Sequence, residues 1–306
     1  MEMSQSLKSQ RIGFIGLGLM GRPMAEHLHA AGADVVIYNR SRSVLDELVG
    51  MGLRPAADPA TVAREVAAGI ICLSLPRTES VEQVLFASGL LNALTTGALV
   101  IDFGTTSVAE TKRFSALTAE RGAAWVDAPV SGGQVGARAA SLTIMAGGSA
   151  TDYERARTVF AVVGAKSTHL GPSGSGQVAK LANQLIVSQT IDAVAQALAM
   201  AEAAGVDSGQ LREALRGGFA DSRILELHGD RMVRRDFQPG GRAELQLKDV
   251  RLIHDLVSEL GLDFPTLRNS LRQWENMVEE RGLGALDHSA LFRLYVPEKQ
   301  DRKKVC

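Results

Sequence analysis

A glycine-rich segment near the start of the chain has the spacing that nucleotide-binding turns require. It follows an apolar run at residues 11–16 and reads Gly16-Leu17-Gly18-Leu19-Met20-Gly21. In a G-x-G-x-x-G turn the first glycine permits the tight turn, the second lets the backbone approach a pyrophosphate, and the third lets helix and strand pack closely. The spacing predicts a dinucleotide site, with a turn that binds nothing as the alternative. A P-loop is excluded, because Arg22-Pro23 stands where that motif needs Lys followed by Ser or Thr.

The residues after the second predicted strand bear on which dinucleotide would bind. NAD sites normally place a carboxylate there, which accepts hydrogen bonds from the ribose 2′-hydroxyl. This chain has Asn39, Arg40 and Ser41 instead. An arginine can form a bidentate contact with a 2′-phosphate and stack on the adenine ring. We therefore expect NADP(H) as the cofactor, with NAD(H) as the alternative if Arg40 is only solvated.

Lys180 has the surroundings that acid–base chemistry needs. It lies in a stretch rich in Ala and Leu, and no charged residue separates it from Asp192. Asn183 and Gln184 follow at the helical spacings i+3 and i+4, so the three polar side chains share one helix face. A desolvated lysine beside a cationic nicotinamide would have its pKa lowered from about 10.4. Such a lysine can hand a proton to a developing alkoxide, which typically accelerates a reaction about 10²- to 10⁴-fold.

A second turn offers hydrogen-bond donors for a small anion. It reads Asp127-Ala128-Pro129-Val130-Ser131-Gly132-Gly133 and stands between a predicted strand and a helical stretch. Two glycines after a serine expose backbone N–H groups, which can hold a carboxylate together with the Ser131 hydroxyl. We predict a substrate-carboxylate site at Ser131, Gly132 and Gly133. An ordinary strand-to-helix turn is the alternative.

The composition excludes several other classes of function. The 33 Lys and Arg residues nearly balance 34 acidic residues, so there is no electrostatic reason to bind nucleic acid or an anionic membrane, and the basic residues 302–304 are too few to change that. Cys72 and Cys306 cannot build a disulfide framework or a thiolate zinc site. His27 and His29 lie on different faces of a predicted helix, so we predict no metal. With no recognisable leader in residues 1–6 and no segment long enough to span a bilayer, we expect a cytoplasmic protein.

The elements that must position these residues follow from the pattern of apolar runs. Strands are predicted at residues 11–16, 35–38, 70–75, 99–102, 124–127 and 142–146, with helices at 20–31 and 43–50. Residues 177–204 contain no Gly or Pro, which predicts one long helix, and no strand pattern follows. We therefore predict an α/β fold with an N-terminal Rossmann domain (11–171), whose doubly wound sheet is mostly parallel. An all-α domain (172–296) would include the long interdomain helix, and residues 1–10 and 297–306 would be flexible ends.

Together these motifs resemble the β-hydroxyacid dehydrogenases, over residues 11–294. The likeness rests on residues 13–25 at the glycine turn, 127–133 at the second turn and 176–184 around Lys180. Residues 216–218, 237–240, 247–249 and 284–290 look most like the branch of the family that reduces tartronate semialdehyde. The resemblance implies a Rossmann domain, an all-α domain and an NAD(P)-linked oxidoreductase.

The resemblance also implies roles for individual residues. Lys180 matches the catalytic lysine of the family, and residues 131–133 match its carboxylate loop. Four more residues match positions near the cofactor: Leu75 and Pro76 in a loop beside it, Thr105 at the nicotinamide ribose, and Lys248, which closes over the site. Two positions depart from the frequent pattern, because Gln184 replaces a second Asn and Gly104 replaces a Ser.

We expect an enzyme that interconverts a small 3-oxo acid or semialdehyde and its hydroxy acid, with tartronate semialdehyde to glycerate as the first choice. Oxidation of 3-hydroxyisobutyrate or another β-hydroxy acid is the alternative within this class. A non-catalytic nucleotide-binding protein on the same fold is the alternative outside it. The apolar surface of the long helix predicts a homo-oligomer, either a dimer or a tetramer.

Overall fold

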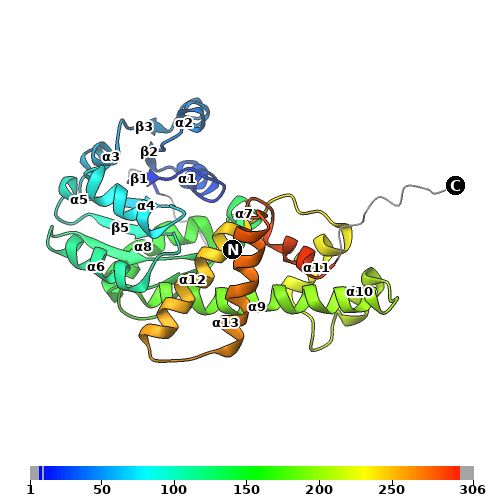
Figure 1. Cartoon of the computed structure of the whole chain (residues 1–306). Coiled ribbons are helices and arrows are strands. Elements are labelled where there is room, and N and C mark those ends of the chain that lie inside the picture. The colour runs from blue at the N-terminus through cyan, green and yellow to red at the C-terminus, as the bar shows by residue number, and fades with distance from the viewer. Residues whose placement is uncertain (1–6, 9, 297–306) are drawn as a thin grey trace. The chain divides into compact units, whose positions relative to one another are not determined.

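The computed structural model describes residues 7, 8 and 10–296, and the chain divides into two compact units between Lys180 and Leu181. The basic residues 302–304, Cys306 and the segment 1–6 lie outside the described residues. Within the end predicted to be flexible, Leu7 is fully buried and its backbone N–H donates to the carbonyl of Ala31. Packing therefore begins ahead of the first strand. Each unit is described by itself below (Figure 1).

Unit 1 alternates strands and helices along its length. Its elements are β1 (Arg11–Ile15), α1 (Gly21–Ala30), β2 (Asp34–Tyr38), α2 (Arg42–Val49), β3 (Arg54–Pro55), α3 (Pro59–Val66), β4 (Ile70–Leu73), α4 (Thr78–Glu82), η1 (Gln83–Ala87), α5 (Leu90–Ala93), β5 (Leu99–Asp102), α6 (Val108–Ala119), β6 (Ala124–Asp127), β7 (Val130–Ser131), α7 (Gly133–Arg138), β8 (Leu142–Ala146), α8 (Ala150–Val163), β9 (Gly164–His169) and the start of α9 (Ser175–Ala203).

The main sheet of unit 1 is parallel throughout and has the order β3-β2-β1-β4-β5-β6. The chain builds outward from β1 on one side, then returns to β4 and builds outward on the other. The carboxyl ends of β1 and β4 therefore form the point where the strand order reverses, which is where open α/β sheets bind ligands. The predicted doubly wound Rossmann fold is confirmed (Figure 1).

Alternate side chains of the strands enter two separate cores, one on each face of the sheet. Phe14 of β1 lies with Met24 of α1 and Phe160 of α8 in the first core, and Ile15 lies with Val62 of α3 in the second. Strands buried on both faces must be apolar along their whole length, which is why their sequences are continuous apolar runs.

The predicted strand at 142–146 forms, but it does not belong to the main sheet. As β8 it pairs antiparallel with β7 and parallel with β9 in a separate three-stranded sheet. Expecting it beside the other parallel strands was wrong. β9 was not predicted, because Gly164–His169 is polar and largely half-buried or exposed, so it lacks the apolar run of a buried strand.

Unit 2 is helical and contains the remainder of α9. Its other elements are α10 (Ser208–Leu215), α11 (Arg223–Arg234), α12 (Ala243–Glu259), α13 (Pro265–Glu275), η2 (Asn276–Glu280) and η3 (His288–Leu294). An isolated antiparallel bridge joins Arg242 to Asp287. Within residues 7–8 and 10–296, no helix combines the length and hydropathy that a bilayer crossing requires.

Candidate functional site

The glycine turn after β1 has the shape of a dinucleotide cradle. Gly16 has φ +95°, and a Cβ there would lie 2.3 Å from the carbonyl oxygen of Ser74. A Cβ at Gly21 would lie 1.9 Å from the carbonyl oxygen of Gly16, whereas a Cβ at Gly18 would meet no atom within 4 Å. The outer glycines therefore allow close packing, and the middle one leaves open space beside the backbone. This arrangement fits a pyrophosphate next to Gly18.

The end of β2 is tied to this turn by Asn39. The Leu17 backbone N–H donates to Asn39 Oδ1 over 3.0 Å, and Asn39 Nδ2 donates to the carbonyl of Ser41 over 3.1 Å. Arg40 is exposed, and it makes no hydrogen bond or ion pair to the described residues. Asn39 is thus a structural link, while Arg40 is accessible to a ligand. Of the other predicted turn residues, Leu19 is exposed and Met20 is half-buried.

The loops after β4 and β5 approach the same edge of the sheet. A Cβ at Gly104 would lie 2.8 Å from the carbonyl oxygen of Leu75, and a Cβ at Gly16 would lie 3.0 Å from Leu75 Cδ2. These contacts bring the loop of Leu75 and Pro76 beside the glycine turn and beside the loop that continues to Thr105. They also explain the Gly at position 104, since a serine there would collide with the Leu75 carbonyl.

A buried polar network below Thr105 was not predicted. Asp102 accepts from the Gly104 N–H over 2.9 Å and from the Thr106 hydroxyl over 3.4 Å. Gln177 at the start of α9 donates to the Gly104 carbonyl over 2.9 Å and accepts from the Thr106 N–H over 3.1 Å. The loop after β5 is therefore fixed to the first turn of α9.

Asp127 holds the same end of α9 to the end of β6. Its carboxylate is fully buried and accepts from the backbone N–H groups of Gly174 over 2.8 Å and Gln177 over 3.0 Å. Desolvation raises the pKa of Asp127, and the amide hydrogen bonds offset part of that rise. A Cβ at Gly176 would lie 2.5 Å from the Met145 carbonyl oxygen, so glycine is needed for this approach. Asp127 positions the helix that carries Lys180.

Lys180 lies beside the predicted carboxylate turn. Its side chain is buried, with the residue only 8% exposed, and its Nζ donates to the carbonyl of Val130 over 2.9 Å. The next residue is Ser131, followed by Gly132 (φ +132°) and Gly133 (φ +59°), both exposed. The fold therefore brings the candidate proton donor and the candidate carboxylate donors together, although 50 positions separate Lys180 from Val130 along the chain.

In unit 2 a second polar cluster continues the helix face of Lys180. Gln184 Nε2 donates to Asp249 Oδ2 over 2.6 Å and to Gln246 Oε1 over 3.2 Å, and Gln184 Oε1 accepts from Asn183 Nδ2 over 2.9 Å. Lys248 pairs with Asp249 across 2.9 Å. Gln184 is therefore engaged within the protein, and Gln246 is a member of this cluster that sequence reasoning did not find.

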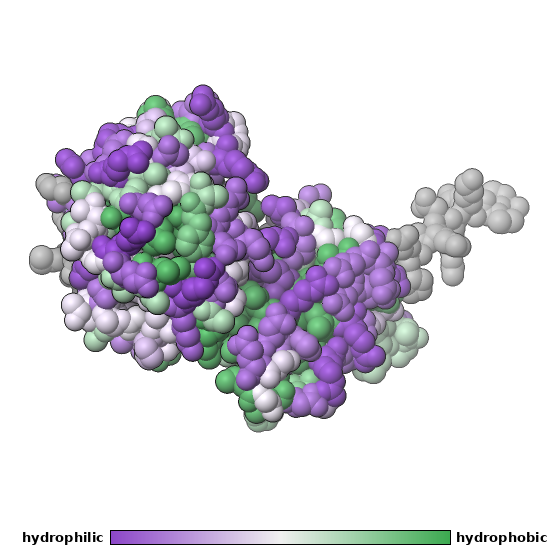
Figure 2. All heavy atoms as spheres, turned by 60° about the vertical axis from the view of Figure 1, so that its left-hand side comes forward, coloured by the Kyte–Doolittle hydropathy of each residue, from purple (hydrophilic) through white to green (hydrophobic). Residues whose placement is uncertain are grey.

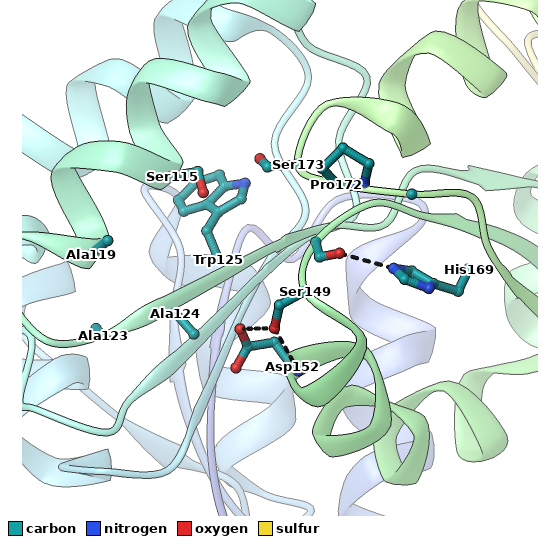
Figure 3. A pocket seen from close by; sticks show the side chains of 12 residues that line it. Ser115, Ala119, Ala123, Ala124, Trp125, Ser149, Asp152, His169, Pro172 and Ser173 are labelled. Atoms are coloured by element: carbon teal, nitrogen blue, oxygen red, sulfur yellow. Dashed lines mark hydrogen bonds between the residues drawn. The ribbon is translucent and has the colours of Figure 1, made fainter.

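A hollow of about 590 Å³ lies elsewhere in unit 1, at the amino-terminal end of β6 (Figure 3). The start of β6 contributes Trp125, the end of α6 Ala119 and the start of α8 Ser149 and Asp152, which bond to each other. His169 also lines it and contacts the Gly148 carbonyl over 2.8 Å. None of the predicted site residues lines this hollow, and ligands of open α/β sheets bind at the opposite, carboxyl ends of the strands. We do not assign the dinucleotide to it.

Three residues that could ligate a metal meet in unit 2, and no spacing in the sequence predicts them. His228 Nε2 lies 3.2 Å from His288 Nε2, and His228 Nδ1 lies 3.6 Å from Asp287. Both carboxylate oxygens of Asp287 already accept hydrogen bonds, from Ser289 and from the N–H groups of Gly240 and Gly241. A metal would have to displace these bonds. The cluster therefore links the loop of Gly240 and Gly241 to η3. Because His228 and His288 are 60 positions apart in the sequence, no local spacing could have predicted their contact.

Two family models together match most of the chain. Residues 11–171 match the NAD-binding domain of 6-phosphogluconate dehydrogenase, and residues 174–295 match the NAD-binding domain of NADP-dependent 3-hydroxyisobutyrate dehydrogenase. The 2-hydroxy-3-oxopropionate reductase of Escherichia coli K12 is 42% identical over 92% of this chain and 96% of that protein. A probable mitochondrial 3-hydroxyisobutyrate dehydrogenase-like protein of Arabidopsis thaliana is 35% identical over 92% of this chain and 84% of that protein.

A solved structure has a similar fold over most of the chain. The 3-hydroxyisobutyrate dehydrogenase of Mycobacterium tuberculosis, solved with L-serine, superposes with a TM-score of 0.85 at 28% identity. The match covers 94% of this chain and 99% of that one.

Proposed function

Because the chain belongs to the β-hydroxyacid dehydrogenase family, and is thus an NAD(P)-dependent oxidoreductase acting on a CH–OH group, we propose that it reduces 2-hydroxy-3-oxopropionate (tartronate semialdehyde) to glycerate. The Escherichia coli reductase of that name matches nearly the full length of both chains. Oxidation of 3-hydroxyisobutyrate is the second candidate, favoured by the other relative and the solved structure.

The contact of Lys180 with the turn before Ser131 is the observation that carries the proposal. A buried lysine amine 2.9 Å from the Val130 carbonyl is not needed to pack a core, and burying an ammonium group is costly. Its place beside a serine and two exposed glycine amides suits a substrate with a carboxylate and a reacting carbonyl. A nucleotide-binding protein without catalysis would have no use for this pair of features.

Each group then has a part in the reaction. Ser131 and the N–H groups of Gly132 and Gly133 bind the substrate carboxylate, and Lys180 protonates the carbonyl oxygen as charge develops on it. When bound along the glycine turn, the nicotinamide cofactor supplies the hydride. Asn183, one helical turn after Lys180, orients the substrate, and Gln184 holds Asn183 in place through their hydrogen bond. Thr105, Leu75 and Pro76 complete the cofactor surroundings in unit 1, and Lys248 is assigned to the cofactor on the family resemblance.

A panel of aldehydes tests the reaction. NADPH consumption is measured with 2-hydroxy-3-oxopropionate, its 2-methyl analogue and unsubstituted 3-oxopropionate, and kcat/KM values are compared. We expect the hydroxylated acid to have the highest value. A higher value for the 2-methyl acid would transfer the assignment to 3-hydroxyisobutyrate.

Replacing Lys180 tests the mechanism. Lys180→Ala removes the proton donor, so kcat should fall about 10²- to 10⁴-fold. The affinity for NADPH, measured by fluorescence titration, should stay within a few-fold of the parent value. Lys166→Ala removes an exposed lysine of the same unit and serves as the control. Unchanged kcat in the Lys180 variant would refute the role of this amine.

Arg40 tests the cofactor preference, which we propose to favour NADP(H) over NAD(H). Its exposed guanidinium can pair with a 2′-phosphate, and a carboxylate there would repel it. Arg40→Glu should weaken NADPH binding about 10- to 100-fold, since a hydrogen bond to a charged group contributes about 1.5–3 kcal/mol. NADH affinity should change little. Equal affinities for the two cofactors in the parent protein would contradict the preference.

We also propose that the protein is a homo-oligomer. Most of the surface drawn in Figure 2 is polar, with apolar patches among it. On α9, Ile186 and Met200 are 67% and 70% exposed, and Phe219 in the loop after α10 is fully exposed. Exposed apolar side chains of this size are what an interface between two copies of the chain would cover. Sedimentation of a 32.5 kDa species would contradict the proposal.

A further inference from the structure

The side chain of Gln177 joins the first turn of α9 to the loop after β5, within unit 1. Gln177 is fully buried. Its Nε2 donates to the Gly104 carbonyl over 2.9 Å, and its Oε1 accepts from the Thr106 backbone N–H over 3.1 Å. These two bonds flank Thr105, the residue assigned above to the cofactor. One amide group thus fixes the backbone on both sides of that residue.

The same part of α9 carries the proposed proton donor. Lys180 follows Gln177 by three positions, so the two side chains are neighbours on the helix surface. Lys180 Nζ donates to the Val130 carbonyl over 2.9 Å, in the turn before Ser131. Gln177 therefore contacts the loop assigned to the cofactor, and Lys180 contacts the loop assigned to the substrate carboxylate.

The start of α9 has an anchor that does not depend on the Gln177 side chain. The Asp127 carboxylate accepts from the backbone N–H groups of Gly174 and Gln177 over 2.8 and 3.0 Å. Removing the Gln177 amide leaves these two bonds in place. It takes away the partners of the Gly104 carbonyl and the Thr106 N–H instead. The side chain therefore determines how far the loop stands from the helix, whereas Asp127 determines where the helix begins.

We propose that Gln177 is a positioning residue, which sets the Lys180 amine at a fixed distance from the cofactor held by the loop of Thr105. This inference rests on the proposed function. In the proposed reduction, the aldehyde carbon gains a hydride from the reduced nicotinamide and the aldehyde oxygen gains the proton of Lys180. Both transfers meet on one carbonyl group, and a misplacement of about 1 Å can slow such a reaction about 10²-fold.

Gln177→Met tests the proposal, because methionine has a similar length but cannot bond the Gly104 carbonyl or the Thr106 N–H. With 2-hydroxy-3-oxopropionate, kcat should fall about 10- to 100-fold. The dissociation constant of NADPH should stay within a few-fold of the parent value. The isotope effect on kcat, measured with NADPH deuterated at the transferred position, should increase as the transfer becomes slower. Gln83→Met, which removes an exposed amide of the same unit, is the control and should match the parent.

A double variant separates positioning of the amine from a general structural role. In a Lys180→Ala protein there is no proton donor left to misplace. Adding Gln177→Met to that protein should therefore lower kcat by no more than about threefold, since residues that act as a unit are not additive. An equal loss from Gln177→Met in both backgrounds would overturn the inference, as would a loss confined to NADPH binding.

Gln177→Glu replaces the methionine variant if circular dichroism shows that the latter does not fold. A protonated glutamate donates to the Gly104 carbonyl as the amide does, whereas an ionised one does not. Burial beside the carboxylates of Asp102 and Asp127 raises the pKa of this glutamate, and Lys180 acts in the opposite sense. The kcat of the variant divided by that of the parent should rise as the pH falls. A ratio that does not change with pH would overturn the inference.

The outcomes also separate the inference from the function on which it rests. A parent protein that reduces neither 2-hydroxy-3-oxopropionate nor 2-methyl-3-oxopropionate overturns both. A parent that reduces either acid, with kcat and isotope effect unchanged in Gln177→Met, overturns only the inference and leaves Gln177 as a structural link.

Discussion

Asp127 in unit 1 and Asp287 in unit 2 are both almost fully buried, and both accept backbone N–H groups, yet their pKa values shift in opposite directions. Burial raises the pKa of Asp127, whose hydrogen-bond donors among the described residues are neutral backbone amides. Burial acts on Asp287 in the same sense, but hydrogen bonds and charge from His228, His288 and Ser289 outweigh it and hold its pKa well below the usual range.

The difference shows what each carboxylate contributes. Asp287 is stabilised as an anion, because Arg231 lies 3.5 Å away and His228 3.6 Å away, so it can lock the loop of Gly240 and Gly241 to η3. Asp127 lacks such compensation and still holds the first turn of α9, one turn before Lys180. Stability alone accounts for Asp287. Burying the Asp127 carboxylate is unfavourable for stability, and this is explained if its role is to position Lys180.

The largest effect on stability is expected at Asp287. Asp287→Ala leaves Arg231 without its buried counter-charge and the N–H groups of Gly240 and Gly241 without an acceptor, which typically costs about 3–5 kcal/mol. The free energy of unfolding from urea titrations should fall by that amount, while kcat of the molecules that remain folded changes little. Asp255→Ala, which removes an exposed carboxylate of the same unit, should stay within about 0.5 kcal/mol. A large loss of kcat in the Asp287 variant would remove the contrast between the two aspartates.

A smaller loss of stability with a larger loss of activity is expected at Asp127. In Asp127→Asn an amide N–H₂ faces one of the two backbone N–H groups, of Gly174 and Gln177, that the carboxylate accepts from. The free energy of unfolding should therefore fall by about 1–3 kcal/mol. The start of α9 should shift, and kcat should fall about tenfold or more, because small misplacements of a catalytic group are costly. NADPH affinity is the internal check and should be retained. Asp152→Asn, at the first turn of α8, should leave kcat unchanged.

The sequence predicts the main sheet and the long helix because both are governed by composition along the chain. Continuous apolar runs mark parallel strands buried on both faces, and 177–204 lacks any helix breaker. β9 escaped prediction because a polar edge strand carries no such run, and β8 was assigned to the wrong sheet because pairing partners are not encoded in a strand's own pattern.

The candidate site likewise has residues that a local sequence pattern predicts and contacts that no local pattern predicts. Lys180 and the turn at Ser131 are predicted as site residues because their residue types are unusual for their positions, and the glycine turn is predicted because of its spacing. The contacts of Gln177 with Gly104 and of Gln184 with Gln246 link segments 73 and 62 positions apart, so no local pattern announces them. The sequence does contain a signal at Asp127. An acidic residue at the end of an apolar strand, with no basic residue nearby in the sequence, needs hydrogen-bond donors from elsewhere in the fold.

The pH dependence of unfolding sharpens the contrast between the two aspartates. Burial and the neighbouring His228 lower the pKa of His288 to about 4, although Asp287 and Asp249 act in the opposite sense and Arg231 adds to the lowering. Between about pH 6.5 and pH 4, His288 is therefore protonated in the unfolded chain but not in the native state. Stability should fall with decreasing pH in this window, by about 1.4 kcal/mol per pH unit for one proton.

His288→Gln removes that titration, so urea unfolding at several pH values should give a flatter profile from pH 6.5 to pH 4. Asp287 adds a loss only at lower pH, because its lowered pKa means that the unfolded carboxyl takes up a proton first, near its ordinary value of about 3.9. Asp127 acts with the opposite sign. Its raised pKa lets the native state bind a proton before the unfolded chain does, so it partly offsets the loss on acidification. On acidification, the free energy of unfolding should therefore fall more steeply in Asp127→Asn and less steeply in His288→Gln than in the parent protein. Parallel pH profiles for the two variants would contradict the opposite signs assigned to Asp127 and His288.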